Sequence, residues 1–435
     1  MDSGKELRHH VLTPLSPYKQ STYHIYLNYF INFYNFYDPK LKKKRIIMEI
    51  AFWCCLFIVF YTYLGYGMLL YILVRIKRAL CKRKTHDHDP SFTPDITLMI
   101  CAYNEEDIVD EKMANTRQID YPKDKLHVMW VTDGSSDKTN ERLSLYDDVT
   151  IVFSPERRGK TAALKHGIKE VKTDIVVMTD ANTMIGKEAI RVIVDHMRNP
   201  KVGCVAGEKR VMARDDSQAA AEGEGIYWKY ESALKRLDYE LHSAMGAAGE
   251  LCAIRTALFE DMPDDTLLDD FIISMRIVER GYVIAYDSNA YAMEYGSADI
   301  VEESKRKRRI AAGGLQSSWR LRSLMNPLLH PITAFQFVSH RVLRWTVTPF
   351  AMLALIPLNV ALVLDNAGWI YTVIWIMQLM FYLAALAGQW LASKGRKNKL
   401  LYIPYYFLFM NANVFRGIRY LATKTNGTWE KAKRG

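Results

Sequence analysis

The strongest constraint on the fold is a run of 25 residues without a charged side chain, residues 50–74. As an α-helix that rises about 1.5 Å per residue, this run spans the roughly 30 Å hydrocarbon layer of a bilayer. It begins too far from Met1, and is too long, to be the apolar part of a secretory signal peptide. We therefore predict a transmembrane helix within residues 46–76.

Two more uncharged runs lie near the end of the chain, residues 345–364 and 367–393. Only two residues separate them, so we predict a helical hairpin through the bilayer. A further run, residues 400–415, contains a proline and two asparagines, and it can span, re-enter or lie at the interface. The chain therefore has three or four predicted spans, the later ones within residues 342–422.

Lysine and arginine residues near the helix ends predict the orientation. Basic residues precede the hairpin at 305–309 and follow it at 394–399, whereas none lies in its tip. Residues 75–344 are therefore predicted on the cytoplasmic side of a bacterial-type inner membrane. The aromatic residues 20–37 form either an interfacial helix, which we favour, or a short extra span. We predict that residues 1–45 form an N-terminal interfacial segment and that residues 301–341 form an amphipathic interfacial segment. Residues 423–435 are predicted to be a basic tail.

Between the first span and the hairpin, the composition is that of a soluble domain and its pattern alternates. Four short apolar runs are each followed by an amphipathic stretch of helical length: residues 95–102, 126–132, 149–153 and 174–179. This alternation predicts an α/β domain over residues 77–300, with a mostly parallel sheet and helices on both faces. Ligands of such sheets bind beyond the carboxyl ends of the strands, so the residues that follow each run are the first candidates for a site.

Cysteine content and charge exclude some functions. The six cysteines form no CxxC pair, which argues against a disulfide scaffold and against a zinc module. The net charge of +10 allows nucleic acid, an anionic membrane surface or phosphorylated ligands as partners. The strongest basic run, residues 305–309, leads directly into the hairpin. Membrane lipid headgroups and ligand phosphates are therefore the nearer anions, and we expect no nucleic-acid partner.

Two nucleotide-binding motifs are absent after the first and third strands. Residues 102–106 contain no glycine, so a dinucleotide fingerprint is missing. Residues 159–161 match the end of a Walker phosphate loop, but Ser154 stands where that loop needs glycine and Pro155 lacks an amide hydrogen. These residues disfavour a nucleoside triphosphatase, and Lys160 is either a contact for a diphosphate or a solvated surface lysine.

Acidic residues end the second and fourth strands and precede a later helix. Asp133 begins a DGS turn and is either an Asx turn or a ligand contact. Asp180, followed two residues later by Asn182, is able to hold a divalent cation beside a diphosphate, although both residue types also cap helices. The adjacent Asp269 and Asp270 repel each other beside apolar residues, which raises one pKa toward that of a general base. The alternative is a helix N-terminus, which also favours acids.

Six signatures occur in order along residues 75–325. They are CAYNEED at 101–107, VTDGSSDKT at 131–139, RGKTAAL at 158–164, TDANT at 179–183, LLDDF at 267–271 and QSSWR at 316–320. In these residues the chain resembles the membrane-integrated family 2 glycosyltransferases, which include cellulose, chitin and hyaluronan synthases and many bacterial exopolysaccharide synthases. The resemblance implies a GT-A fold that binds a nucleotide-diphosphate sugar together with Mg²⁺ or Mn²⁺.

The resemblance also implies a role for each matching residue. Tyr103, Glu105 and Asp133 match positions that hold the nucleotide base and ribose, and Asp270 matches the catalytic base. The implied donor-binding set is Ala102, Tyr103, Asn104, Glu105, Asp133, Lys160 and Asp180, the metal-binding set is Asp180 and Asn182, and the acceptor-binding set is Gly249, Asp269, Gln316, Trp319 and Arg320.

Two positions depart from the family pattern. Asn182 replaces the second acid of the usual Asp-x-Asp, so coordination of the metal through that side chain is weaker or indirect. The family's Gln-x-x-Arg-Trp motif is associated with processive polymerisation, and here Trp319 and Arg320 are exchanged. Trp319 is therefore either an interface anchor or a residue that stacks on a sugar ring, and processivity is left open.

Together these inferences predict an inverting, metal-dependent glycosyltransferase, a hexosyltransferase that moves a sugar from a UDP-sugar to the growing end of a polysaccharide or glycan at the membrane. A transferase that adds one sugar to a polyprenyl-linked acceptor is the alternative within the enzyme class. A nucleoside triphosphatase and a catalytically silent membrane scaffold are the alternatives from other classes. Because three or four spans are few for a channel within one chain, we expect secretion to need a homo-oligomer or a partner protein.

Overall fold

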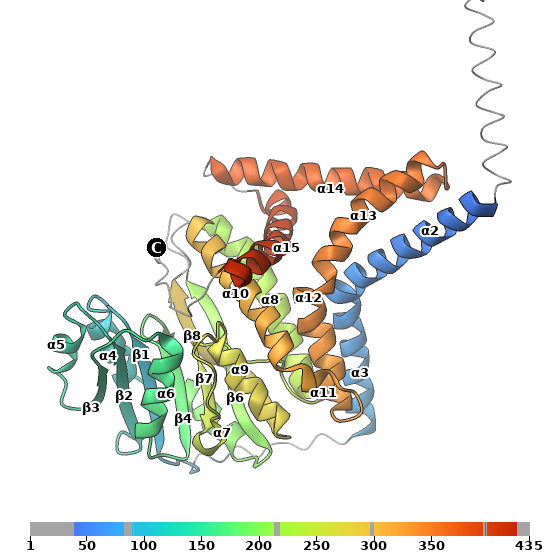
Figure 1. Ribbon diagram of the computed structural model, residues 1–435. Helices are drawn as coiled ribbons and strands as arrows, with labels where there is room; N and C mark the ends of the chain where they lie inside the picture. The colour runs from blue at the N-terminus through green and yellow to red at the C-terminus, as the bar shows by residue number, and fades with distance from the viewer. Residues whose placement is uncertain are drawn as a thin grey trace, which may run out of the picture.

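The computed structural model describes residues 39–81, 89, 91–212, 218–295, 300–394, 396 and 398–423. The predicted interfacial helix at 20–37 and nearly all of the basic tail lie outside these residues. An α/β domain forms one part of the molecule, and a group of long helices projects from it (Figure 1).

The α/β domain contains an eight-stranded sheet in the order β3-β2-β1-β4-β7-β6-β8-β5. The strands are β1 (Ile96–Ala102), β2 (Leu126–Asp133), β3 (Val149–Ser154), β4 (Ile175–Asp180), β5 (Met184–Ile185), β6 (Val202–Met212), β7 (Cys252–Arg255) and β8 (Val283–Tyr295). The first four strands by position are parallel, as predicted, and β7 then runs antiparallel to both β4 and β6. The sheet is therefore more mixed than the alternation of runs indicated.

Helices cover both faces of the sheet, which confirms the predicted fold class. α6 (Lys160–Glu170) and α9 (Asp269–Glu279) pack into the core on one face, whereas α4 (Val109–Arg117) and α7 (Ala189–Met197) pack into the core on the other. All seven residues of β1 are buried as a result. A strand covered on both faces reads as an uninterrupted apolar run, which is why the sequence pattern was clear there.

The strand register brings the predicted site residues to one edge of the sheet. Ala102 at the end of β1 pairs with Thr132, the residue before Asp133. On the other side of β1, Cys101 pairs with Asp180. The carboxyl ends of β1, β2 and β4 therefore lie together, with the two aspartates on either side of the central strand.

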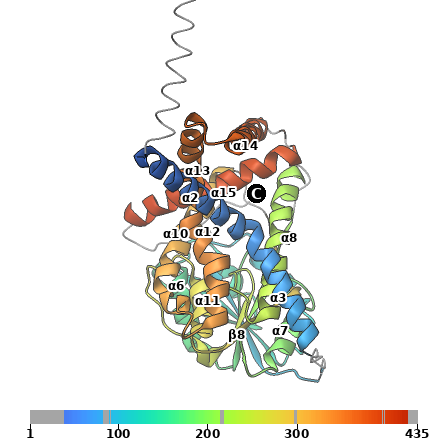
Figure 2. The same cartoon turned by 90° about the vertical axis from the view of Figure 1, so that its right-hand side faces the viewer.

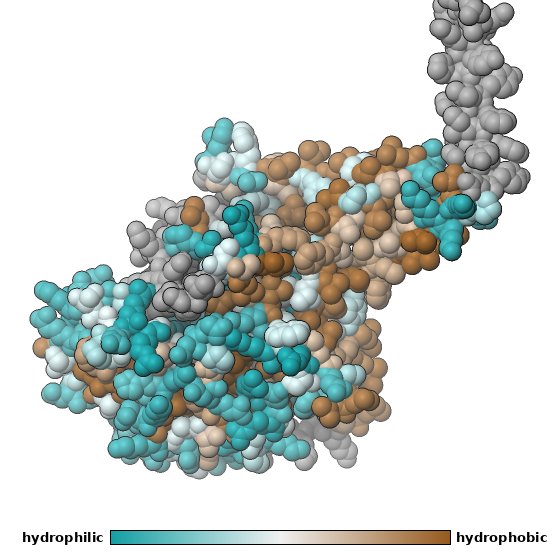
Figure 3. Space-filling view, in the orientation of Figure 1, coloured by the Kyte–Doolittle hydropathy of each residue, from teal (hydrophilic) through white to brown (hydrophobic). Residues whose placement is uncertain are grey.

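Three helices in the described part of the chain are long and apolar enough to cross a membrane. The first is continuous from α2 (Pro39–Phe60) through a π-turn, η1 (Tyr61–Gly65), into α3 (Tyr66–Leu80), so it exceeds the predicted span. The others are α13 (Val347–Leu364) and α14 (Trp369–Ser393). Their outward faces are apolar, whereas the visible surface of the α/β domain is largely polar (Figure 3).

The predicted hairpin is not a pair of antiparallel neighbours. α13 and α14 diverge from their shared turn, and α14 lies across α15 (Lys399–Thr423) instead (Figure 1). Gly388 allows this close approach of α14 to α15, because a Cβ atom there would lie 2.2 Å from the carbonyl oxygen of Leu401. Residues 400–415, whose position the sequence left open, are thus part of α15, a helix packed between other helices. The side-chain amides of its two asparagines form hydrogen bonds. Asn411 accepts from the Tyr63 hydroxyl at 2.6 Å, and Asn413 donates to the Phe409 carbonyl at 2.8 Å.

The segment predicted as amphipathic and interfacial is packed into the protein. It forms α10 (Ile300–Arg320), η3 (Arg322–Met325), α11 (Pro331–Phe337), η4 (Val338–Val342) and α12 (Leu343–Trp345). Gly313 and Gly314 explain the close packing of α10, because Cβ atoms there would lie 2.5 Å from Leu268 and 2.4 Å from Trp345. α8 (Gln218–Leu241) runs beside α3 (Figure 2). Arg306 of α10 pairs with Glu250 and Glu294 of the α/β domain, whereas Lys305 and Lys307 pair with glutamates of α10 itself. The remaining short helices are α5 (Thr139–Leu143) and η2 (Thr256–Leu258).

Candidate active site

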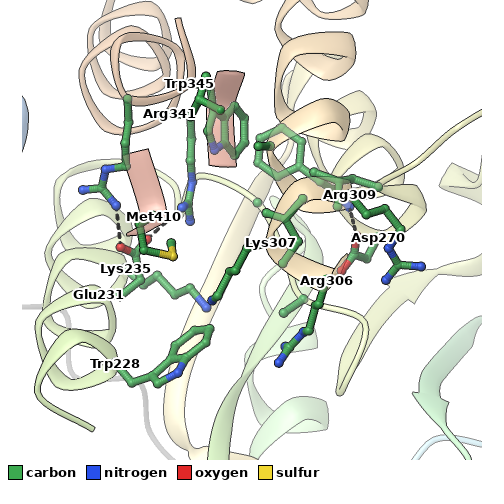
Figure 4. Close-up of a pocket in the computed structure, with 18 of the residues that line it drawn as sticks. Trp228, Glu231, Lys235, Asp270, Arg306, Lys307, Arg309, Arg341, Trp345 and Met410 are labelled. Atoms are coloured by element: carbon green, nitrogen blue, oxygen red, sulfur yellow. Dashed lines mark hydrogen bonds and ion pairs between the residues drawn. The ribbon is translucent and has the colours of Figure 1, made fainter. Parts of the chain in front are cut away.

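A cavity of about 730 Å³ lies between the carboxyl edge of the sheet and the helices. Lys160, Asp180, Asp269 and Asp270 line one end of it. Side chains from α2, η1 and α15 line the other end, and α8, α10 and α12 form the walls between them (Figure 4). One continuous space therefore connects the sheet edge to the long apolar helices.

Lys160 is the first residue of α6 and holds the carboxylates together. Its Nζ atom lies 2.6 Å from Asp180 Oδ1 and 4.0 Å from Asp269 Oδ2. Burial lowers the pKa of Lys160, but the charges of Asp180, Asp269 and Asp270 raise it further, so the pKa lies above its usual range. The lysine is thus a partly buried, ion-paired cation within the site, and the interpretation as a solvated surface residue is wrong.

Asp270 lies in the first turn of α9, where the Phe271 amide donates to its Oδ1 atom at 2.8 Å. Burial and the neighbouring charge of Asp269 raise the pKa of Asp270 to about 7, although Lys160 opposes them. The acidic pair thus lies at a helix N-terminus, one of its two interpretations. The role of Asp270 as a general base stays a prediction, with which the raised pKa is consistent.

Gly249 lies directly beside these groups. A Cβ atom there would lie 3.0 Å from Lys160 Nζ and 3.4 Å from Asp270 Oδ2. The glycine thus lets the backbone before β7 approach the charged side chains closely.

Asp133 supports the loop that leads into α6. It is buried, and its two carboxylate oxygens accept from the amides of Arg158 and Gly159 at 2.9 and 2.6 Å. In a Walker loop such amides would bind phosphate, so their use by Asp133 argues further against a nucleoside triphosphatase. Contact of Asp133 with a nucleotide stays a prediction.

The loops after β1 and β2 are bound to each other. Asn104, at a φ of 52°, donates its amide to Ser135 Oγ at 3.1 Å and accepts from the Ser136 amide at 2.8 Å. The Tyr103 ring lies 3.9 Å from the Arg157 guanidinium, and Glu105 is buried. Together with Ala102, these residues form the sheet edge next to the cavity but not its lining.

The predicted metal ligands offer two oxygen-bearing side chains. Asp180 ends β4 and is paired with Lys160, whereas Asn182 Oδ1 is buried and accepts no hydrogen bond from a described residue. The described residues contain no group of three metal-binding side chains. Such a pair fits Mg²⁺ or Mn²⁺ that takes most of its ligands from a diphosphate and water.

Three of the predicted acceptor-binding residues do not line the cavity. Gln316 Oε1 accepts from the Leu267 amide at 3.1 Å, and Arg320 pairs with Asp265 at 2.8 Å, so both hold the loop before Asp269. Trp319 is 70% exposed beside Arg322 and does not line the cavity. The tryptophan that does line this end of the cavity is Trp345 of α12, which packs edge-on against Phe271.

Sequence reasoning missed the helical walls of the cavity. Charged and aromatic residues from α8, α10 and α12 line it, including Trp228, Glu231, Lys235, Lys307, Arg341 and Trp345. The available signal was the spacing of Trp228, Glu231 and Lys235 by three and four positions, which places them on one helix face. Only the fold shows that this face borders the same cavity as Asp269 and Asp270.

Acidic residues lie at the carboxyl edge of this mixed sheet with a partly buried lysine between them, an arrangement that fits the GT-A class of α/β domains. The chain belongs to the glycosyltransferase-like family 2, whose model matches residues 94–313. That match covers most of the α/β domain predicted over residues 77–300.

Known proteins resemble this chain in part or in fold. The poly-beta-1,6-N-acetyl-D-glucosamine synthase of Staphylococcus aureus is 27% identical over 227 residues, which cover 50% of this chain and 54% of the relative. The synthase of the same name from Staphylococcus epidermidis is 26% identical over 261 residues, 57% of this chain and 61% of the relative. The chain thus spans little more than half the length of these relatives.

The structure of a mannosyltransferase from Pyrobaculum calidifontis, in complex with GDP-Man and Mn²⁺, matches with a TM-score of 0.65. It is 22% identical, and the match covers 86% of this chain and 99% of the other. At this identity the likeness establishes the shared fold, including the long helices.

Proposed function

We propose that the protein is an inverting, cation-dependent glycosyltransferase that moves a sugar from a UDP-sugar to a hydroxyl group of a glycan at the membrane. The observation that carries this proposal is Asp270, a carboxyl group with a pKa of about 7 in the same cavity as the Lys160–Asp180 pair. The family and the names of the staphylococcal relatives support a nucleotide-sugar transferase that extends a glycan.

The proposed reaction needs a general base for the acceptor hydroxyl and a positive charge beside the leaving diphosphate. Asp270 accepts the proton of the acceptor hydroxyl as its oxygen forms a bond to the anomeric carbon. The bond from that carbon to the diphosphate breaks on the opposite face, so the configuration inverts and the nucleoside diphosphate leaves with the electron pair. Lys160, held by Asp180 and Asp269, supplies positive charge next to the diphosphate.

A divalent cation completes this proposal. Asp180 and Asn182 would hold Mg²⁺ or Mn²⁺, and the solved mannosyltransferase of the same fold contains Mn²⁺. When bound, the cation neutralises charge on the leaving diphosphate. Asp180 keeps its second carboxylate oxygen available for this contact, since the Lys160 bond uses Oδ1.

The pKa of Asp270 predicts how the rate depends on pH. Only the ionised carboxylate accepts a proton, so transfer at limiting substrate should fall about tenfold per pH unit below the Asp270 pKa of about 7. Initial rates between pH 5 and 9 at fixed donor and cation concentrations measure this dependence. A rate independent of pH across this range would remove Asp270 from the role of base.

A donor screen tests the proposal as a whole. The purified full-length chain is incubated with radiolabelled UDP-sugars, with Mg²⁺, Mn²⁺ or EDTA, and both released UDP and product size are measured. We expect the protein to turn over one class of UDP-sugar, and we expect EDTA to abolish this turnover. A product ladder supports extension of a polysaccharide, whereas one discrete product supports the single-addition alternative. Phosphate release from ATP without any sugar transfer would contradict the proposal.

The site also suggests the cellular arrangement. Because UDP-sugars are made in the cytoplasm, we propose that the α/β domain lies there and that the three apolar helices cross the inner membrane. Secretion of a long product through a homo-oligomer or partner protein stays part of the proposal.

A further inference from the structure

The far end of the cavity opens where lipid would lie. Phe60, Leu64 and Ile403 line the cavity, and they are also 48, 57 and 45% exposed on the surface of the helices. These side chains face both the cavity and the outside, so the space that begins at Asp270 ends at the apolar surface of the membrane helices. An occupant that fills it from end to end must be polar at one end and apolar at the other.

Lys235 is a buried cation in the middle of this cavity. It lies on α8, is 5% exposed and lines the cavity. It forms no ion pair or hydrogen bond with any described residue, and its Nζ atom lies 5.7 Å from the centre of the Tyr286 ring. The carboxylate one turn earlier, Glu231, is already bound by Arg341 and Arg344 at 2.7 Å each.

Lys307 brings a second buried ammonium group to the same space. It lies on α10, is 4% exposed, and its Nζ atom is 5.7 Å from the Trp228 ring and 5.8 Å from the Tyr406 ring. Lys235 and Lys307 extend from opposite walls into the space above Trp228 (Figure 4). Lys307 pairs with one carboxylate, Glu303 at 3.3 Å, so the two lysines together retain an excess positive charge.

An uncompensated charge in a protein interior is strongly unfavourable, because it has lost its hydration without gaining a partner. A phosphate group between the two ammonium groups would remove that penalty, because each lysine would then donate to an oxygen that carries negative charge. The apolar end of the cavity decides the source of the phosphate, since a soluble anion would leave Phe60, Leu64 and Ile403 without a partner.

We propose that Lys235 and Lys307 bind the phosphate of a lipid-phosphate-linked acceptor. The hydrocarbon chain leaves between the end of α2, η1 and α15, and the sugar on the phosphate extends toward Asp270, where its hydroxyl is deprotonated. This assignment rests on the proposed transferase function, and it names the acceptor that the function leaves open.

Binding of radiolabelled polyprenyl phosphate to the full-length chain in detergent tests the site. The wild type should bind polyprenyl phosphate at least about tenfold more tightly than the matching polyprenol, and Lys235→Met and Lys307→Met should each remove most of that difference. Lys235→Arg should retain it. Lys229→Met is the matched control, since Lys229 is an exposed lysine on the same helix, and it should bind both lipids as the wild type does.

Three results would overturn the assignment. They are equal affinity of the wild type for the phosphate and the alcohol, equal binding by Lys235→Met and Lys229→Met, and displacement of the probe by equimolar inorganic phosphate or phosphatidylglycerol. The last would indicate a general anion or bulk-lipid site. Donor hydrolysis by the wild type is measured separately, so an inactive preparation that still binds the lipid phosphate contradicts the transferase function and not the site.

Discussion

Replacement of Asp270 by asparagine is expected to reduce sugar transfer by about 10²–10⁴-fold, the usual contribution of a general base. The amide cannot accept the hydroxyl proton, yet it has nearly the same size and still accepts from the Phe271 amide. Binding of the UDP-sugar should therefore survive. Transfer rates and donor affinity, measured on the same preparation, check both parts of this expectation.

The same variant should be at least as stable as the wild type above neutral pH. The pKa of Asp270 is raised to about 7, so protonated Asp270 contributes stability below the unfolded-state pKa, and this contribution is lost as the pH rises through about 7. Asparagine stays neutral throughout. The melting temperature of Asp270→Asn relative to wild type should therefore be higher at pH 8 than at pH 5.

Asp264→Asn is the matched control for Asp270→Asn. Asp264 lies six residues earlier, is 64% exposed and pairs with Lys165 at 2.8 Å. Its loss should change neither transfer nor melting temperature appreciably, because exposed ion pairs contribute about 0–1 kcal/mol. Asp270→Asn with wild-type turnover would exclude Asp270 as the base and, with it, the mechanism proposed above.

The sheet and its acidic edge could be predicted because local patterns determine them. β1, β2 and β4 are covered on both faces, so each appears as an apolar run, and parallel pairing brings their carboxyl ends together. Asp180 was found by this rule, whereas Asp270 was found as part of an acidic pair before a later helix and from the family resemblance. Asp133 was found too, but its hydrogen bonds to the loop before α6 depend on a backbone conformation that no pattern describes.

The walls of the cavity could not be predicted in this way. Trp345 and Arg341 lie about 25 residues after the signature that suggested Trp319, and they reach the site because α10 packs against α12 through Gly314. The basic run of α10 was assigned to lipid headgroups and ligand phosphates from its position in the chain. Its Arg306 instead lies 3.4 Å from Glu250, since tertiary packing brings a closer anion.

A buried charge network joins these walls to the membrane helices. Glu231 on α8 accepts from His340 Nε2 at 2.9 Å and from Arg341 and Arg344 at 2.7 Å each. The other ring nitrogen of His340 lies 2.5 Å from Asp238, which also accepts from the Tyr66 hydroxyl of α3. The network thus connects α8, one wall of the cavity, to α3 at the end of the first apolar helix and to α12.

Glu231 is the centre of this network, and its ionised form is favoured. Burial raises its pKa, but Arg344, Arg341 and His340 lower it more, so the pKa lies well below the usual value of 4.5. A depressed pKa means that the carboxylate contributes stability above pH 4.5, and that this contribution is lost as the pH falls below that value. Replacement of Glu231 should therefore matter most near neutral pH.

Glu231→Gln is expected to destabilise the protein by about 3–5 kcal/mol at pH 7, the cost of leaving buried charges without their partner. Glu240→Gln is the matched control on the same helix, because Glu240 is 27% exposed and pairs with Arg78, which is 46% exposed. Thermal unfolding in detergent should show a loss of several degrees for Glu231→Gln and little change for Glu240→Gln. The difference in melting temperature between the two variants should become smaller toward pH 4, where the Glu231 carboxylate contributes less to the stability of the wild type. Equal melting temperatures of the two variants at pH 7 would mean that the network does not stabilise the junction between the catalytic domain and the membrane helices.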